Sequence, residues 1–145
     1  MTILVAAARP TIRVLQNVFS RDGKVISAIR IHDALKILPG GVDLIICSVQ
    51  FDESRMFEFL GAVKTNPKTR AIPFVSVRHL PSVLRPTAFK GIQFACKGYG
   101  AEFIDLGALE AQYGINEAQR RLREMVLALL PTNKTERGTP GARDS

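Results

Sequence analysis

The stretch that most constrains the fold is Val42–Ser48, VDLIICS. Four consecutive residues from Leu44, LIIC, are apolar, and this density is typical of a strand buried on both faces, as in the middle of a parallel sheet. Asp43 opens the strand, and Ser48 ends it where a loop begins. In open α/β sheets, ligands and chemistry lie at the carboxyl ends of the strands. We therefore expect a functional edge at Ser48 and in the loop Val49–Arg55 behind it.

Strand-like and helix-like segments alternate along the rest of the chain. The apolar or alternating runs that predict four more strands are Thr2–Ala8, Lys24–Arg30, Ala71–Val77 and Glu102–Leu106. Apolar residues at helical spacing predict helices after Pro10, over His32–Leu38, over Met56–Val63, over Thr87–Lys97, and in a last helix that Asn116 caps and Pro131 ends. Gly107–Gly114 is predicted to be a long connection. This regular alternation predicts an α/β protein, with a doubly wound five-stranded parallel sheet and helices on both faces.

Length and composition indicate one domain. With 145 residues, of which 46% are hydrophobic and 23% charged, the chain is long enough for a single core. We expect residues 1–130 to form this domain and residues 131–145, a polar stretch with Gly and Pro, to be a disordered tail. No apolar run approaches the roughly 20 residues that cross a bilayer, and the N-terminus lacks the basic start of a signal peptide. The sequence therefore predicts a cytoplasmic protein without a membrane partner.

Cysteines and histidines are few and scattered. Cys47 and Cys96 are the only cysteines, and we expect reduced thiols, which are the default in the cytoplasm. His32 and His79 are the only histidines, and the four residues show no metal-site spacing, so no metal is expected. No glycine-rich phosphate loop follows the first strand, where Ala6–Arg9 reads AAAR, and no cofactor is expected.

The net charge of +7 is placed unevenly. Residues 61–100 contain no Asp or Glu, and their cations are Lys64, Lys68, Arg70, Arg78, Arg85, Lys90 and Lys97. Such a span suggests an acidic partner surface or a nucleic-acid backbone. A solvated basic face that aids solubility explains the same charges.

Four segments, in this order and spacing, resemble the receiver domains of response regulators, the CheY-like family. They are ILVAAARP at Ile3–Pro10, VDLIICS at the central strand, IPFVSV at Ile72–Val77, and FIDL after Gly100-Ala101. The resemblance covers about Thr2 to Leu130 and implies a flavodoxin-like, receiver-like fold and a role in two-component signalling. It also implies that the fourth helix, the fifth strand and the fifth helix form the partner-docking face.

Each position that carries the family's chemistry departs from it. The acid pair that would hold Mg²⁺ falls on Ala7 and Ala8, and the phospho-acceptor falls on Ser48. The hydroxyl position falls on Arg78, or on Ser76 if the register slips, and the lysine after the fifth strand has only Leu106 and Gly107 as candidates. Alanine binds no Mg²⁺, and a serine hydroxyl without a base is a poor nucleophile. The resemblance is therefore to a degenerate pseudo-receiver, without enzymatic activity.

Arg9 and Arg78 map to the rim of this degenerate pocket. Because alanines replace the two acids, the local charge should be positive. The pocket then holds an anion, or Arg78 forms an internal pair with Asp52 or Glu53. We favour the internal pair, since arginine is rarely left unpaired when it is partly buried.

Three functions compete. The leading one is a phosphorylation-independent signalling module that binds a protein with an acidic surface; the candidate contact residues are Arg85, Lys90, Lys97, Arg120, Arg121 and Arg123. A homodimer is compatible with the sequence. The second is a nucleic-acid-binding or transcription-associated regulator that uses the basic span, although few aromatic residues are present for base stacking. The third and weakest is a small flavodoxin-like enzyme.

Overall fold

One parallel sheet forms the centre of the computed structural model, which describes residues 1–79 and 86–131, and the backbone alone for 86–89. Its five strands are β1 (Thr2–Ala6), β2 (Lys24–Ala28), β3 (Leu44–Ser48), β4 (Phe74–Arg78) and β5 (Glu102–Asp105). They lie in the order β2-β1-β3-β4-β5, and every neighbouring pair is parallel. Every residue of β3 is buried, as its apolar run predicts. The doubly wound five-stranded sheet is thereby confirmed.

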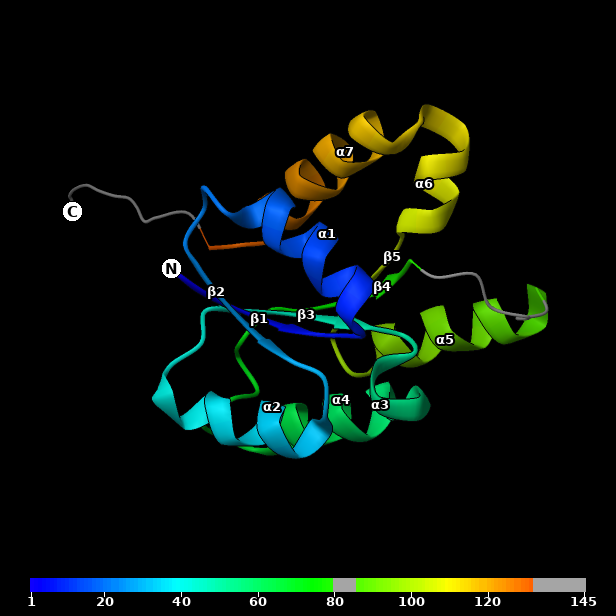
Figure 1. The fold of residues 1–145 in the computed structure, drawn as a ribbon. Helices are drawn as coiled ribbons and strands as arrows, with labels where there is room; N and C mark the ends of the chain where they lie inside the picture. Colours follow the sequence, from blue (N-terminus) through cyan, green and yellow to red (C-terminus); the bar gives the residue numbers. More distant parts are fainter. Residues whose placement is uncertain (80–85, 132–145) are drawn as a thin grey trace.

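Helices cover both faces of the sheet (Figure 1). Along the chain they are α1 (Arg9–Phe19), α2 (Ile31–Ile37), the 3-10 turn Leu38–Gly40, α3 (Phe51–Ser54), α4 (Met56–Thr65), α5 (Pro86–Gly98), α6 (Leu106–Tyr113) and α7 (Ile115–Ala128). Figure 1 shows α1, α6 and α7 on one face and α2, α3, α4 and α5 on the other. Among the described residues, no helix is long and apolar enough to cross a membrane.

Two buried clusters fill the space between the sheet and its helices. Side chains alternate between the faces of a strand, so Ile45 and Cys47 join one cluster and Leu44 and Ile46 join the other. The first cluster packs under α2, α4 and α5, and the second packs under α1 and α7. This arrangement leaves the loops at the ends of the strands as the accessible edges of the sheet.

The segment before the last helix differs from its prediction. The long connection predicted over Gly107–Gly114 is wrong, because Leu106–Tyr113 forms α6. The Asp105 side chain caps this helix by accepting a hydrogen bond from the Ala108 N–H at 2.9 Å. Asn116 is not the cap of the last helix: α7 begins at Ile115, directly after Gly114.

Other differences are small. β1 and β2 end at Ala6 and Ala28, earlier than predicted, because their last pairing partners in the sheet lie there. The extended loop predicted after the fourth strand falls mainly on residues 80–85, and the predicted tail falls on residues 132–145. Both segments lie outside the described residues.

Candidate functional site at the carboxyl edge of the sheet

The residues that follow the first strand at the carboxyl edge of the sheet, Ala7 and Ala8, have only methyl side chains. Ala7 is fully buried, and its N–H donates to the Ala28 carbonyl at 3.1 Å, which fixes the chain as it leaves β1. Ala8 precedes the first turn of α1 and accepts the Ile12 N–H at 2.9 Å. Methyl side chains therefore occupy the two positions at which the resemblance would place metal-binding acids.

Ser48 ends β3 in a closed environment. Ser48 is only 3% exposed, and its Oγ accepts a hydrogen bond from the Gln50 N–H at 3.1 Å. This contact is a local turn of the kind that serine often forms with the backbone. Within the described residues, no His or carboxylate is hydrogen-bonded to the hydroxyl, so nothing there activates Ser48 as a nucleophile.

The loop after Ser48 is held in an unusual conformation. Three consecutive residues, Asp52, Glu53 and Ser54, have positive φ angles of 46°, 56° and 67°. Non-glycine residues rarely adopt this left-handed region, at a cost on the order of 1 kcal/mol or more each. The short α3 is therefore a strained turn, and strong contacts must hold it.

Asp52 supplies those contacts. Its side chain is 5% exposed, and its carboxylate accepts the Ile31 N–H at 2.9 Å, at the start of α2. Arg30 and Arg55 approach the same carboxylate at 3.6 and 3.7 Å. The predicted pair between Arg78 and Asp52 or Glu53 is therefore wrong: Asp52 joins the β3–α3 loop to the start of α2.

Arg78 pairs with Asp105 instead. The two residues are register partners at the ends of β4 and β5, and Arg78 Nη1 donates to Asp105 Oδ1 at 3.0 Å. Their side chains are 21% and 24% exposed. The same Asp105 oxygen caps α6 through the Ala108 N–H. One carboxylate therefore ties the fourth strand, the fifth strand and α6 together, and it neutralises the cation at the edge.

Gly107 is shaped to this ion pair. A Cβ added there would lie 3.1 Å from Arg78 Nη1, 3.4 Å from Asp105 Oδ1 and 3.4 Å from the His79 carbonyl oxygen. The 3.1 Å separation is shorter than most contacts of a real Cβ atom, whereas the two at 3.4 Å are at the lower limit of ordinary contact. The first turn of α6 can approach the Arg78 guanidinium this closely because Gly107 has no side chain.

A second set of linked polar contacts, through His79, lies beside the contacts of Arg78 and Asp105. Thr11, fully buried at the start of α1, has its Oγ1 3.0 Å from His79 Nδ1. On the other side of the ring, His79 Nε2 lies 3.6 Å from Glu110 Oε2 on α6. Nδ1 can accept a hydrogen bond from the Thr11 hydroxyl while Nε2–H faces the Glu110 carboxylate. α1, the end of β4 and α6 are joined by these contacts.

Ser76 and Leu106 lie away from the polar edge. The Ser76 hydroxyl contacts Met56 Sδ at 2.7 Å in the buried layer under α4 and α5. Leu106 is fully buried in the opposite layer, under α1 and α7. The register therefore brings Arg78, and not Ser76, to the end of β4, and it is Asp105 that carries the polar side chain at the end of β5.

The side chains at this edge do not fit the Mg²⁺ ion that the resemblance implies. Mg²⁺ prefers carboxylate and water oxygens in octahedral geometry. Ala7 and Ala8 carry no oxygen on their side chains, and Asp105 is engaged with Arg78. No group of three His, Cys, Asp or Glu residues in the described part of the chain is placed to hold a metal ion. No metal-dependent step follows from these residues.

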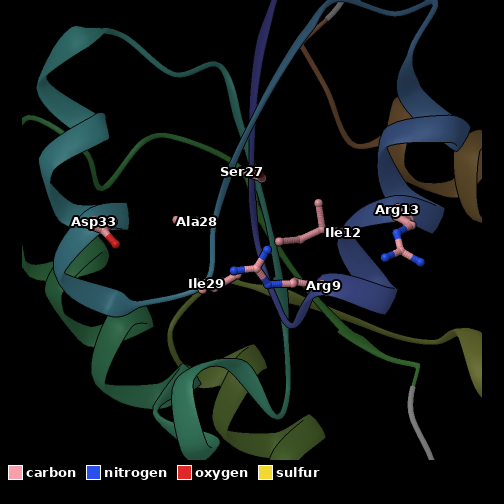
Figure 2. A pocket seen from close by; sticks show the side chains of 7 residues that line it. All are labelled: Arg9, Ile12, Arg13, Ser27, Ala28, Ile29 and Asp33. Carbon is pink, nitrogen blue, oxygen red and sulfur yellow. The ribbon is translucent and has the colours of Figure 1, made fainter.

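Arg9 lies in a separate place from the Arg78 pair. It lines a cavity of about 440 Å³ between α1 and the end of β2, together with Arg13 and with Asp33 of α2 (Figure 2). Arg78 does not line this cavity. The two arginines that the sequence assigns to one rim therefore lie at different places.

The cations of α7 are already paired. Arg120 binds Glu117 and Glu124, and Arg121 Nε donates to Glu117 at 2.9 Å. These arginines lower the pKa of Glu117 to about 2, chiefly through the Arg120 hydrogen bond. Arg123 reaches Asp22 at 2.6 Å, between α7 and the loop after α1. Arg120 and Arg121 thus form ion pairs within α7, and Arg123 joins α7 to the loop after α1. These pairs reduce the positive charge that the three arginines offer to a partner.

The cations of α5 are different. Lys90 and Lys97 are exposed, and α5 contains no acidic residue. Between them stands Phe94, whose residue is 81% exposed. Arg85, the other predicted contact residue of this region, lies outside the described residues. Of the predicted cations, those of α5 are therefore the most available to a partner.

Several solved structures of response regulators resemble this fold. No protein-family model matches the chain, and no curated protein matches it. Among solved structures, the phosphorylated cyanobacterial phytochrome response regulator RcpA is 18% identical, with a TM-score of 0.69 over 90% of this chain and 98% of that one. A response regulator from Hahella chejuensis is 18% identical, with a TM-score of 0.68 over 93% and 98%. The Vibrio cholerae chemotaxis response regulator CheY4 is 18% identical, with a TM-score of 0.62 over 86% and 96%.

The chain has the fold of a receiver domain. This fold confirms the resemblance seen in the strand motifs, and it accounts for the strand order and for helices on both faces. At these identities the likeness is one of fold, so the chemistry of the site depends on the chain's own residues.

The sequence does not predict three polar contacts at the edge of this receiver fold: Arg78 with Asp105, Thr11 with His79, and His79 with Glu110. A signal for the first was present. Arg78 directly follows the predicted strand Ala71–Val77, and Asp105 is the next-to-last residue of the predicted strand Glu102–Leu106; neighbouring parallel strands bring their carboxyl ends to one edge. Glu110 had no such signal, because its segment was predicted to be a connection.

Proposed function

We propose that this chain is a phosphorylation-independent pseudo-receiver, a cytoplasmic signalling or regulatory module that acts by protein–protein contact and not as an enzyme. The observation that carries the proposal is the Arg78–Asp105 pair at the edge of the sheet, where a receiver would bind a phosphoryl group. Phosphoryl transfer needs a nucleophile, a divalent ion and a free cation. Ala7 and Ala8 provide no metal ligand, Ser48 is buried and hydrogen-bonded, and the cation is neutralised.

The contacts at the edge support a single fixed state. Asp105 holds Arg78 and the first turn of α6, and His79 links Thr11 to Glu110. A switch needs two arrangements of similar free energy that a ligand or modification can bias. Charge-assisted contacts on both sides of the β4 end favour one of them without phosphorylation.

Acyl-phosphate chemistry is the direct test. The purified protein is incubated with Mg²⁺ and acetyl phosphate, and its intact mass is read. We expect no phosphate adduct. A variant with Ala7→Asp, Ala8→Asp and Ser48→Asp restores the carboxylates and serves as a comparison that can gain the adduct.

A labile adduct on the unmodified chain would contradict the proposal. Asp43, Asp52 or Asp105 would then be the acceptor, and peptide mapping would identify which. Asp43 lies at the opposite end of β3, where its carboxylate accepts the Thr2 N–H at 2.8 Å. Asp52 and Asp105 are engaged with arginines. All three are therefore expected to remain unmodified.

The partner surface proposed for this module centres on α5. Exposed Phe94 is flanked by Lys90 and Lys97, so a protein with an acidic surface around an apolar recess is complementary to it. Partner capture at low and at high salt tests this surface. The variant Lys90→Glu with Lys97→Glu should lose the partner, whereas Lys36→Glu on α2 should retain it. The same surface is compatible with a homodimer, which light scattering over a concentration series detects.

Nucleic-acid binding is the second candidate, because the cations of residues 61–100 have no acidic neighbour in that span. Two of those cations are engaged within the fold. Lys64 Nζ donates to the carbonyls of Arg70 and Ile72 at 3.0 and 2.9 Å, and Arg78 binds Asp105. Fluorescence anisotropy with labelled duplex and single-stranded DNA tests this function. Binding that falls steeply as salt rises would favour it over the protein partner.

A further inference from the structure

The cavity between α1 and α2 lies apart from the polar edge described above. It has a volume of about 440 Å³, within the range of small-molecule sites. The side chains around it are those of Arg9, Ile12, Arg13, Ser27, Ile29 and Asp33, with Ala28 at its base. Figure 2 shows Arg9 reaching from α1 toward Ile29, with Asp33 on the opposite side. The cavity is therefore bounded by cations on one wall and oxygen acceptors on the other.

Arg9 and Arg13 form the cationic wall. They stand four residues apart, on one face of α1, and both are exposed. In the described part of the chain, no carboxylate lies within 4.0 Å of either guanidinium, and the first turn of α1 contains no acid. Figure 2 shows the Arg9 side chain directed toward Ile29 and the Arg13 side chain farther along α1, so the two guanidinium groups border the cavity at separate places. Guanidinium groups bind phosphate through paired hydrogen bonds.

Asp33 and Ser27 form the opposite wall. Asp33 lies in the first turn of α2, and Ser27 lies near the end of β2. Asp33 forms no ion pair with Arg9 or Arg13 across the cavity. A carboxylate and a hydroxyl accept hydrogen bonds from sugar-type hydroxyl groups, as an acidic residue does for ribose in nucleotide sites. Asp33 would repel a second anion, so the ligand must present a neutral donor here.

We propose that this cavity binds a phosphate monoester of a hydroxylated ring, either a sugar phosphate or a nucleoside monophosphate. The phosphate faces Arg9 and Arg13, the hydroxyl groups face Asp33 and Ser27, and the ring lies over Ile12. The volume exceeds what a phosphate ion fills, and the acceptors on the far wall have no role toward a simple anion. The cavity thus gives the module a ligand input that is separate from its partner surface on α5.

Three probes test the site on the full chain: inorganic phosphate, ribose 5-phosphate and AMP. Calorimetry gives the affinities, and backbone amide shifts locate the contacts. We expect ribose 5-phosphate to bind at least about tenfold more tightly than inorganic phosphate, which corresponds to about 1.4 kcal/mol. AMP separates the two sources, because a nucleotide site binds it more tightly than ribose 5-phosphate and a sugar-phosphate site does not.

Three variants separate the two walls. Arg9→Gln with Arg13→Gln should weaken all three probes by at least about tenfold. Asp33→Asn should weaken ribose 5-phosphate but not inorganic phosphate, since only the former uses the hydroxyl acceptor. Arg21→Gln, on an exposed arginine outside the cavity, is the matched control and should leave binding unchanged.

Each contrary result overturns the proposal. If none of the three probes binds at concentrations up to about 10 mM, the binding free energy is weaker than about 3 kcal/mol and the proposed site does not exist. Equal binding of phosphate and ribose 5-phosphate removes the hydroxyl recognition. Tighter binding of ribose 5-phosphate by the Asp33→Asn variant would also contradict hydroxyl recognition, because it would mean that Asp33 only repels the phosphate. The variants change exposed side chains, so unaltered melting temperatures confirm that each one is folded.

Discussion

At the residue scale, the carboxyl edge is governed by the partners of two acids. The Asp52 carboxylate accepts the Ile31 N–H and faces two arginines, and the Asp105 carboxylate accepts the Ala108 N–H and binds Arg78. Each acid thus has a backbone donor and a cation. Both carboxylates anchor helix starts through these contacts, so each is engaged in holding the fold.

Replacement of Arg78 by methionine removes the cation from Asp105 while keeping most of the side-chain volume. The two side chains are 21% and 24% exposed, so the carboxylate would remain partly buried without its partner. We expect Arg78→Met to lower the free energy of unfolding by about 1–3 kcal/mol. Urea denaturation measures this loss, and faster hydrogen exchange at the Ala108 amide locates it.

The matched control is Arg70→Met. Arg70 is exposed, and its side chain makes no hydrogen bond or ion pair in the described residues, so its replacement should change stability by less than about 0.5 kcal/mol. If Arg78→Met is as harmless as this control, the ion pair does not hold the edge. Faster exchange in the loop after Ser48, instead of at Ala108, would point to the pairing predicted from sequence.

The residue-scale prediction from sequence was half right. The sequence predicts that Arg78 is partly buried and internally paired, but it assigns the partner to the loop after Ser48. The register of the sheet decides the pairing, because Arg78 lies opposite Asp105 and Asp52 is already held at the start of α2. Sequence proximity to the pocket contains no such information.

At the element scale, the glycines at the two ends of the Gly107–Gly114 segment explain why the sequence does not predict α6. Gly107 and Gly114 suggested a loop, although the residues between them are good helix formers. The helix depends on the Asp105 cap and on Glu110 reaching His79, which are contacts made across the fold. The five strands and the other long helices have strong internal periodicity, and the sequence was sufficient for them.

The charges of α7 give this helix a pH dependence. Glu117 lies in its first turn and binds Arg120 and Arg121, which lower its pKa from an ordinary 4.5 to about 2. Because the folded pKa lies below the unfolded one, the stabilisation is complete above about pH 4.5 and is lost as pH falls toward 2. An NMR titration of the Glu117 carboxyl carbon measures this pKa directly.

Two comparisons make the measurement specific. Arg120→Gln should raise the pKa of Glu117 most, because the Arg120 hydrogen bond is the largest cause of the shift, and Arg121→Gln should raise it less. High salt should also raise the pKa, since these groups are exposed to solvent. A Glu117 pKa near 4.5 in the unmodified chain would show that the ion pairs of α7 are not maintained in solution.

At the scale of the whole molecule, the two cysteines of one buried cluster lie on elements that are attached to the fold in different ways. Cys47 lies in the middle of β3, and Cys96 lies on α5, yet both belong to the cluster on the same face of the sheet. We expect Cys47 to become accessible only when the sheet opens, because every residue of the central strand β3 is buried. Cys96 becomes accessible when α5 alone detaches, because that helix packs at the sheet's edge strand, β5 (Figure 1).

We therefore expect the two thiols to react with an aromatic disulfide reagent by different routes. Both are fully buried, and burial raises the pKa of Cys47 well above its ordinary 9.0 and also that of Cys96, so little reactive thiolate is present in the native state. Cys96 should react first, at a rate that depends weakly on urea. The Cys47 rate should follow the free energy of global unfolding as urea rises.

Single variants assign the two phases. Cys96→Ala leaves only the slow, urea-sensitive phase, and Cys47→Ala leaves only the fast one, while both thiols of the unmodified chain react at once in concentrated guanidinium chloride. Equal native-state rates for Cys47 and Cys96 would mean that α5 and the central strand open as one unit. The partner surface on α5 would then be as rigid as the sheet, and binding there would be coupled to the stability of the whole domain.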